Sequence, residues 1–330
     1  MRVSGTIFRE YDIRGIVGDD LTVAVVRAVG RAYASRLREL TGLDVPRVTV
    51  GHDNRPSSPE LARAMCAGLN ESGADVILID TVPTPTLYWA DREFGTDGGI
   101  QITGSHNPPE YNGIKMVVGG GSLYGDAIQD LRLRIEADQY LDGAGTTERR
   151  EILDRYVEAV SAAVDMPAPI KVVLDCGNGT GSVVACEALE AAGIEVIPLY
   201  CESDGSFPNH HPDPTVDKNL VDLISLVKET GAALGIGLDG DADRIGAVDE
   251  NGTIHSVRLR QSKLEADELL KTRAGWVDVR GWSAGVDYEA TVQGFAVVEA
   301  NVVGGDLLGG SAGQEGGVWR RCEGSRDHLG

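Results

Sequence analysis

The chain has 330 residues, of which 42% are hydrophobic and 25% are charged, a composition typical of a folded globular protein. This length exceeds that of one ordinary domain and predicts two or three. With 51 acidic and 30 basic residues, the formal net charge is −21. Such a charge disfavours nucleic acid and anionic membranes as partners. An anionic ligand would therefore need a local cluster of arginine and lysine side chains.

The cysteines and the N-terminus place the chain in a reducing compartment. Five cysteines are widely spaced and form no C-x-x-C pair, which argues against a disulfide framework and a thiolate zinc site. The N-terminal stretch MRVSGTIFREYDIRG lacks the apolar segment of a signal peptide, and no apolar run is long enough to span a bilayer. We expect a cytoplasmic protein, either a monomer or a homodimer.

A first unit alternates strand and helix from about residue 45. A helix opens at Ser57, Ser58 and Pro59 and stops at Gly73, with apolar residues at helical spacing. Pro83 and Pro85 are expected to end the strand that follows this helix. The strands predicted in this unit cover 47–53, 75–82, 98–103 and 114–120.

A second unit begins near residue 170, after a linker expected at 138–150. Its predicted strands cover 170–175, 194–200 and 233–241, and its predicted helices cover 182–193 and 217–230. Alternation of this kind predicts α/β domains with mixed, largely parallel sheets. We expect an N-terminal domain over 1–140 and a second α/β domain over 150–254.

The composition changes abruptly after Ile254. That residue is the last isoleucine, all 13 prolines lie before it, and three of the four tryptophans fall in the last quarter. We expect residues 255–330 to be the remnant of a third domain, altered by truncation or by a change of reading frame, and at best marginally ordered.

A polar loop between two predicted strands, T-G-S-H-N-P-P-E-Y-N-G-I-K-M over 103–116, places Ser105 beside His106. A glycine precedes Ser105, and two prolines after His106 stiffen the backbone. A serine hydroxyl becomes a good nucleophile only with a base, a metal or a strong field nearby, and Lys115 can return a cation toward it. Taken alone, the same residues also suit a rigid turn with polar capping groups.

Three carboxylates follow the strand L-G-I-G-L at every second position: Asp239, Asp241 and Asp243. Hard oxygen donors this close repel one another unless a hard cation such as Mg²⁺ lies among them. Arg244 comes next and suits a phosphate. A calcium loop of the EF-hand type is rejected, because Arg244 stands where that loop needs glycine.

Three further segments are weaker signals. The stretches F-R-E-Y-D-I-R-G at 8–15 and G-H-D-N-R-P-S-S at 51–58 place arginines near glycine or a helix start, where an anion could bind. An exposed, ion-paired turn also explains the first. The stretch D-C-G-N-G-T-G-S at 175–182 lacks the G-x-G-x-x-G spacing of a dinucleotide site, so a tight strand-to-helix turn is the better interpretation.

Together and in this order, these motifs resemble those of the α-D-phosphohexomutases, the phosphomannomutase/phosphoglucomutase family. The match comprises F-x-x-Y-D-I-R-G at 8–15, T-G-S-H-N-P with the following N-G-x-K at 103–115, D-C-G-N-G at 175–179 and D-G-D-A-D-R at 239–244. The resemblance covers roughly residues 6–254. Nothing in the sequence corresponds to the fourth domain of that family, and we find no sugar-reading loop of the G-E-x-S-G type.

The resemblance implies an isomerase that interconverts the 1- and 6-phosphates of mannose or glucose. Ser105 would carry a phosphoryl group, a hexose 1,6-bisphosphate would be the intermediate, and glucose 1,6-bisphosphate would be the activator. Mg²⁺ would be held by Ser105, Asp239, Asp241 and Asp243. The catalytic residues would be Ser105, Lys115, Arg14 and His106. Hexose phosphates would contact Tyr11, Arg14, Arg55, Asn107, Lys115 and Arg244. The alternative is an inactive phosphosugar-binding remnant of that family.

Overall fold

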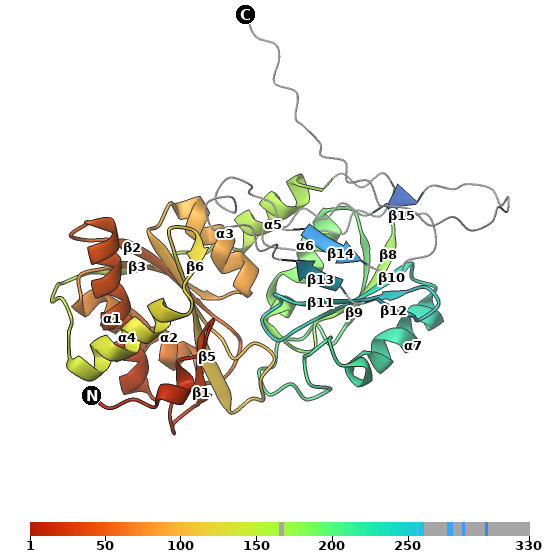
Figure 1. The fold of residues 1–330 in the computed structure, drawn as a ribbon. Helices are drawn as coiled ribbons and strands as arrows, with labels where there is room; N and C mark the ends of the chain where they lie inside the picture. The colour runs from red at the N-terminus through yellow and green to blue at the C-terminus, as the bar shows by residue number, and fades with distance from the viewer. Residues whose placement is uncertain (165–167, 256, 261–275, 280–285, 288–300, 303–330) are drawn as a thin grey trace, which may run out of the picture.

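The computed structural model describes residues 1–164, 168–255, 257–260, 276–279, 286–287 and 301–302. Two α/β lobes lie side by side, the N-terminal one built on a seven-stranded sheet and the second on a five-stranded sheet (Figure 1). The prediction of consecutive α/β domains with mixed, mostly parallel sheets is confirmed.

The first sheet has the strand order β1-β5-β4-β2-β3-β7, with the short β6 paired to β5. Strands β4, β2, β3 and β7 run parallel, whereas β1 and β5 are antiparallel to their neighbours. The strands are β1 (Ile13–Ile16), β2 (Arg47–His52), β3 (Asp75–Thr81), β4 (Gly98–Ile102), β5 (Tyr111–Val118), β6 (Gly121–Ser122) and β7 (Thr147–Arg149).

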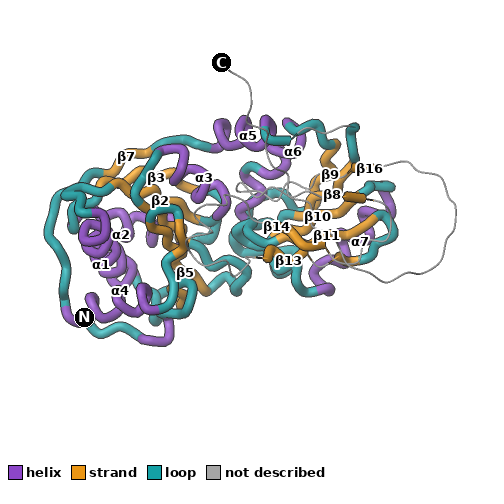
Figure 2. Tube along the Cα trace, turned by 45° about the horizontal axis from the view of Figure 1, so that its top comes forward, coloured by secondary structure: helices purple, strands orange, loops and turns teal. Residues whose placement is uncertain are grey.

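Helices cover both faces of this sheet, and β3 shows why. Successive side chains of a strand point to opposite faces. Val76 and Leu78 belong to the large core under α1, α2 and α4, whereas Ile77 and Ile79 pack with α3. Figure 2 shows α1, α2 and α4 grouped on one side of the sheet and α3 on the other. The helices are α1 (Val23–Thr41), α2 (Ser58–Glu71), α3 (Thr84–Phe94) and α4 (Asp126–Ala137), preceded by the 3₁₀ turn η1 (Gly5–Ile7).

The second sheet repeats this layered plan with the strand order β12-β11-β10-β8-β9. Val172 and Leu174 of β8 face the core that includes Ala185 of α6, and Val173 faces α7. The strands are β8 (Lys171–Asp175), β9 (Glu195–Leu199), β10 (Leu234–Leu238), β11 (Ile245–Asp249) and β12 (Ile254–His255). The helices are α6 (Ala185–Ala191) and α7 (Val221–Thr230), with the 3₁₀ turns η2 (Thr180–Val183) and η3 (Asp217–Leu220).

Helix α5 (Leu153–Ala162) connects the two lobes along the chain. It lies between α3 of the first lobe and α6 of the second (Figures 1 and 2). Tyr156 meets Trp89 of α3 edge to face, with ring centroids 5.5 Å apart. The same face of α5 packs on Val184 and Ala188. An aromatic pair and a shared apolar cluster therefore fix the lobes to one another.

Several details differ from the sequence-based expectations. The expected linker 138–150 ends in β7, which pairs in parallel with β3 and so belongs to the first sheet. Strand β5 begins at Tyr111, which shortens the serine loop. Pro85 stands in the first turn of α3, a position that proline favours, so the prolines open a helix as well as end a strand.

The predicted helix at 182–193 is also different, because it is split into η2 and α6. No prediction was made for α1, α3, α4 and α5.

Beyond His255 only short strands are described. They form two antiparallel pairs, β13 (Val257–Arg260) with β14 (Trp276–Val279) and β15 (Val286–Asp287) with β16 (Asn301–Val302). The rest of the expected third-domain remnant lies outside the described residues.

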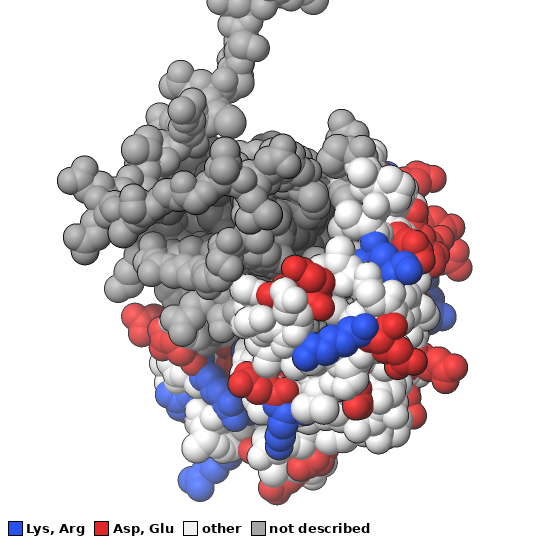
Figure 3. Space-filling model, turned by 90° about the vertical axis from the view of Figure 1, so that its right-hand side faces the viewer, with Lys and Arg blue, Asp and Glu red and all other residues white. Residues whose placement is uncertain are grey.

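The helices and the surface charges of the described residues bear on whether the chain could cross a membrane and on how its charge is spread. Among them, no helix has both the length and the apolar character that crossing a bilayer requires. Where the described surface of the second lobe is visible in Figure 3, acidic and basic side chains are interspersed.

Candidate functional site

The serine loop follows β4 and places Ser105 in an unusual backbone conformation. Its φ of 50° lies in the left-handed region, which non-glycine residues adopt at a cost of about 1–3 kcal/mol. The side chain is buried, and Oγ donates a hydrogen bond to Asp239 Oδ2 over 2.9 Å. Nδ1 of His106 lies 3.2 Å from the same Oγ. The strained turn thus directs the serine hydroxyl at the acidic turn of the other lobe.

The acidic turn joins β10 to β11 and gathers three carboxylates. One oxygen from each of Asp239, Asp241 and Asp243 lies within 4.8 Å of the others. Asp239 and Asp241 are fully buried. Backbone N–H groups of Asp243 and Arg244 each donate to Asp239 Oδ1 over 3.0 Å, which fixes the turn.

The electrostatics of this turn favour a bound cation. Burial and the two neighbouring carboxylates raise the pKa of Asp239 well above its usual range. Within the described residues, Asp241 Oδ1 is buried without a hydrogen-bond partner. Carboxylate oxygens are the ligands that hard divalent cations prefer. The residues present therefore fit Mg²⁺, which would satisfy the orphaned oxygen and offset the crowded negative charge.

Lys115 of β5 reaches this turn from the first lobe. Its Nζ lies 2.7 Å from Asp241 Oδ2 and 2.5 Å from Asp243 Oδ2. Burial opposes the ammonium charge, but both carboxylates outweigh it and hold the pKa of Lys115 well above its usual range. Lys115, Ser105 and the three aspartates, which the sequence placed in one site, are therefore in direct contact.

The remaining cations lie around His106. Burial first, and then Arg244 and Arg14, lower the pKa of His106 to about 4, so its ring is neutral at pH 7. Arg14 forms an ion pair with Asp12. With its amide oriented to satisfy both groups, Asn107 accepts hydrogen bonds from Arg14 Nε at 3.2 Å and Nη1 at 2.8 Å. His106, Arg14 and Asn107 are thus brought together at the serine loop.

Tyr11, unlike His106, Arg14 and Asn107, is not held at the serine loop by a contact described above. It stands in the turn before β1 with 74% of its surface exposed.

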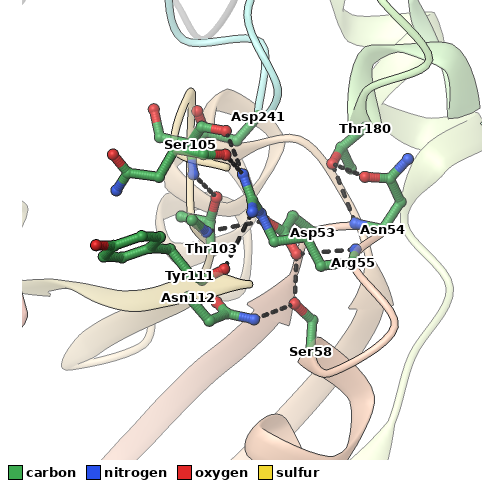
Figure 4. A network of polar contacts seen from close by, with 12 residues as sticks. Asp53, Asn54, Arg55, Ser58, Thr103, Ser105, Tyr111, Asn112, Thr180 and Asp241 are labelled. Carbon is green, nitrogen blue, oxygen red and sulfur yellow. Dashed lines mark hydrogen bonds and ion pairs between the residues drawn. The ribbon is translucent and has the colours of Figure 1, made fainter. Parts of the chain in front are cut away.

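Arg55 has a different position from the one expected for a substrate-binding residue. Its side chain is 0% exposed. Nε donates to Asp53 over 3.1 Å, and the four remaining N–H groups donate to main-chain carbonyls of the serine loop and of Tyr111 (Figure 4). These carbonyls belong to Ser105 (2.8 Å), Asn107 (2.6 Å), Pro108 (2.6 Å) and Tyr111 (3.0 Å). A guanidinium has five N–H donors. All five are used, and none remains for a phosphate.

Asp53 is a residue of this network that the sequence analysis did not single out. It follows β2, and its carboxylate accepts from Ser58 Oγ, from the Gly104 N–H at 3.0 Å and from Arg55 (Figure 4). An acid at the carboxyl end of a parallel strand was the available signal, since ligand sites gather at such ends. Asp53 and Arg55 together hold the backbone on which Ser105 stands.

Two other missed residues join the lobes. Thr84, at the start of α3, donates from Oγ1 to Asp241 Oδ2 over 2.5 Å, and its N–H donates to the Asp241 carbonyl over 3.0 Å. Asn54 donates to the Asn178 carbonyl over 2.8 Å and lies beside Thr180 (Figure 4). The site therefore lies between the lobes, with the serine and lysine from one and the aspartates from the other.

Comparisons with known proteins agree with this architecture. Residues 5–141 match the family model of phosphoglucomutase/phosphomannomutase, alpha/beta/alpha domain I, and residues 154–252 match that of domain II. A phosphomannomutase/phosphoglucomutase of Pseudomonas aeruginosa is 49% identical over 249 residues, which are 76% of this chain and 53% of that protein. A phosphoglucomutase of Neisseria gonorrhoeae is 41% identical over 275 residues, 83% of this chain and 59% of that protein.

A solved structure gives the same result. The phosphoglucomutase/phosphomannomutase family protein of Burkholderia thailandensis superposes with a TM-score of 0.73 at 42% identity, over 77% of this chain and 56% of that chain. The chain thus spans a little over half the length of the relatives that it matches. Through the matched residues 5–141 and 154–252, the chain belongs to the phosphoglucomutase/phosphomannomutase family.

Proposed function

We propose that the chain transfers a phosphoryl group between Ser105 and a hexose phosphate, and so interconverts the 1- and 6-phosphates of glucose or mannose. One observation carries the proposal: the strained, buried Ser105 hydroxyl lies 2.9 Å from a carboxylate of a three-aspartate turn. Relatives at 41–49% identity bear the names of these mutases. The reaction would pass through a hexose 1,6-bisphosphate, and glucose 1,6-bisphosphate would load Ser105.

Asp239, Asp241, Asp243 and the oxygen on Ser105 would hold Mg²⁺. When bound, the ion neutralises charge on the transferred phosphoryl group. The orphaned Asp241 Oδ1 and the raised pKa of Asp239 support this assignment. Thr84 keeps Asp241 in place through two hydrogen bonds across the lobes.

The cations of the site would bind and orient the substrate. Phosphoryl transfer depends mainly on positioning and on charge neutralisation. Arg14, Lys115 and Arg244 supply positive charge around Ser105, which meets the need that the net charge of −21 creates. When a sugar hydroxyl attacks the phosphorus, the bond to Ser105 Oγ breaks and the hydroxyl loses its proton. We assign that proton transfer to Lys115, supported by Arg14. Asp241 and Asp243 hold the proton on Lys115 in the present arrangement, so Lys115 would accept the hydroxyl proton only after these carboxylates bind a cation in its place.

His106, Asn107 and Tyr11 would complete the site. His106 and Asn107 lie on the serine loop and are proposed to shape it, because one lies beside Ser105 Oγ and the other pairs with Arg14. Tyr11 is proposed to line the substrate cleft. Arg55 is proposed to position the loop, because its five donors are engaged with the protein.

The test is conversion of glucose 1-phosphate and mannose 1-phosphate to the 6-phosphates, with Mg²⁺ and a trace of glucose 1,6-bisphosphate. The full chain is compared with Ser105→Ala and with Ser122→Ala, a control at an exposed serine of β6. Turnover lost in Ser105→Ala and kept in Ser122→Ala is the expected result. Labelled phosphate from the bisphosphate should also appear on Ser105.

Two outcomes separate the alternatives. Labelling of Ser105 without turnover would support phosphoryl transfer and contradict a complete mutase cycle in this chain. Binding of hexose phosphates that is unchanged in Ser105→Ala, with neither label nor turnover, would contradict the proposal. It would also identify the chain as a non-catalytic phosphosugar-binding member of the family.

A further inference from the structure

Three thiols gather where β8 and β9 end, outside the residues used above. Cys176 directly follows β8, Cys201 follows β9 by two residues, and Cys186 lies on α6. The sulfurs of Cys176 and Cys201 are 3.2 Å apart. Cys176 is fully buried, whereas Cys186 and Cys201 are half-buried, and all three are free thiols.

We propose that Cys176 and Cys201 form a reversible disulfide when the folded chain meets a small-molecule disulfide such as oxidised glutathione. The two residues follow adjacent parallel strands whose register pairs Asp175 with Leu199, so the sheet already holds their backbones as neighbours. A disulfide has a sulfur–sulfur length of about 2.05 Å. The two sulfurs therefore need to move by little more than an ångström.

Cys186 would supply the reactive sulfur, since it is half-buried where Cys176 is buried and its thiol shares hydrogen bonds with the other two. Hydrogen bonds from the thiols of Cys176 and Cys201 lower the pKa of Cys186, against the opposing effect of burial. The thiolate is the nucleophile in thiol–disulfide exchange. Cys186 is half-buried and so remains within reach of a small reagent, whereas the buried Cys176 is not.

The exchange balances in three steps. The Cys186 thiolate attacks one sulfur of the reagent, which forms a mixed disulfide and releases one thiolate of the reagent. Cys201 gives its proton to that thiolate and attacks Cys186, which releases the second reagent thiolate. Cys176 gives its proton to the second thiolate, attacks Cys201 and regenerates the Cys186 thiolate. Two protein thiols are oxidised, and one small disulfide is reduced to two thiols.

The link would lie next to the acidic turn. Cys176 opens the glycine-rich turn that ends at Thr180, and the Thr180 N–H donates to the Gly240 carbonyl over 2.8 Å. The inference does not depend on the proposed mutase function, since it concerns the covalent state of the chain.

The test treats the native full chain with oxidised glutathione, alkylates the remaining thiols and cleaves after glutamate. Cleavage places Cys201 in the peptide 196–202, and places Cys176 and Cys186 together in 159–187. We expect these peptides to be joined, with fragment ions that place the link on Cys176 and the alkyl group on Cys186. Dithiothreitol should reverse the link.

Two controls sharpen the test. Cys322→Ser removes the thiol at 322 and should leave the link unchanged. Cys186→Ser should yield the same link at least about tenfold more slowly, because the first attack then falls to Cys201, whose raised pKa keeps it as the unreactive thiol at pH 7. A stable link through Cys186, glutathione adducts with no internal link, or the same link pattern in the urea-unfolded chain would each overturn the inference.

Discussion

The buried guanidinium of Arg55 holds the backbone of the serine loop in place through its five hydrogen bonds. Arg55→Met would remove all five donors and leave Asp53 buried with its ion pair broken. We expect this change to lower the free energy of unfolding by about 3–5 kcal/mol. Arg55→Lys should lower it less, because lysine keeps the charge but lacks the planar fork. Urea denaturation of the purified variants measures both values.

The matched control for Arg55 is Arg63→Lys, an exposed arginine of α2, which should stay within about 0.5 kcal/mol of the parent chain. If Arg55→Lys behaved like this control, the five hydrogen bonds would not hold the loop. In that case, Arg55 would again be a candidate for binding substrate.

His210 gives a prediction about pH. Its Nε2 lies 2.9 Å from Asp175 Oδ2, and its Nδ1 lies 3.0 Å from the His211 carbonyl. Burial alone would lower the pKa of His210, but Asp175 outweighs it, with His211 and Asp222 adding to the rise. Tyr200 packs against the ring edge.

Because the folded pKa of His210 is raised, its stabilising effect is complete below the unfolded pKa near 6.5 and is lost as pH rises through the folded value. His210→Asn should therefore lower the unfolding free energy more at pH 5.5 than at pH 8.5. His211→Asn is the control from the neighbouring position. An equal loss at both pH values would contradict the prediction, and NMR titration of the ring measures the pKa directly.

The residue assignments show what a sequence reveals about a site. Ser105, Lys115 and the three aspartates were predicted to lie in one site, because each stands in a motif whose residue types suit phosphoryl transfer or metal binding. Arg55 was assigned to substrate because a sequence displays a cation but not the carbonyls that engage it. Thr84 had no motif at all, since its role arises only when the two lobes meet.

At the scale of an element, the contact between the serine loop and the acidic turn depends on Gly240. A Cβ built on this residue would overlap the carbonyl oxygen of Ser105. We expect Gly240→Ala to force the two turns apart and to lower the unfolding free energy by about 1–3 kcal/mol. It should also lower phosphoryl labelling of Ser105 under conditions in which the variant is still fully folded, since the displaced turn carries the three aspartates.

Gly121→Ala is the matched control, because Gly121 is exposed and its nearest atom would lie 3.8 Å from the added Cβ. Chemical denaturation and labelling with glucose 1,6-bisphosphate give the two readouts. Unchanged stability and labelling in Gly240→Ala would show that the turns are not in the contact described.

The elements themselves were predictable where the pattern was strong. Strands β2, β3, β4, β8 and β9 were predicted within one residue at their ends, because apolar runs bounded by turn residues mark them. The strand predicted over 233–241 extends three residues beyond the observed end of β10, because the acidic turn begins at Asp239. Strand β7 was not predictable. Its three residues, Thr-Glu-Arg, are exposed and carry no apolar pattern, and only their pairing with β3 makes them a strand. Helix α1 did carry its signals, Thr22 as N-cap and Gly42 as C-cap, which the sequence analysis passed over.

At the scale of the whole molecule, the site exists only while the two lobes stay together. Ser105, Lys115 and Thr84 come from one lobe, and the acceptors of their hydrogen bonds come from the other. Asn54 strengthens this junction. Its side-chain amide donates to the Asn178 carbonyl at 2.8 Å and to Ser203 Oγ at 2.9 Å.

Asn54→Ala should therefore loosen the junction without unfolding either lobe. The lost hydrogen bonds lie at the edge of the interface, and about 1–3 kcal/mol is the expected loss for such groups. Amide hydrogen exchange should rise in two places far apart in the sequence, the serine loop and the turn at 176–180, while β2 and β8 keep their protection. Asn251→Ala, at an exposed asparagine of the second lobe, should leave both segments unchanged. Faster exchange in only one of the two segments would mean that the lobes do not depend on one another at this contact, and that each holds its half of the site alone.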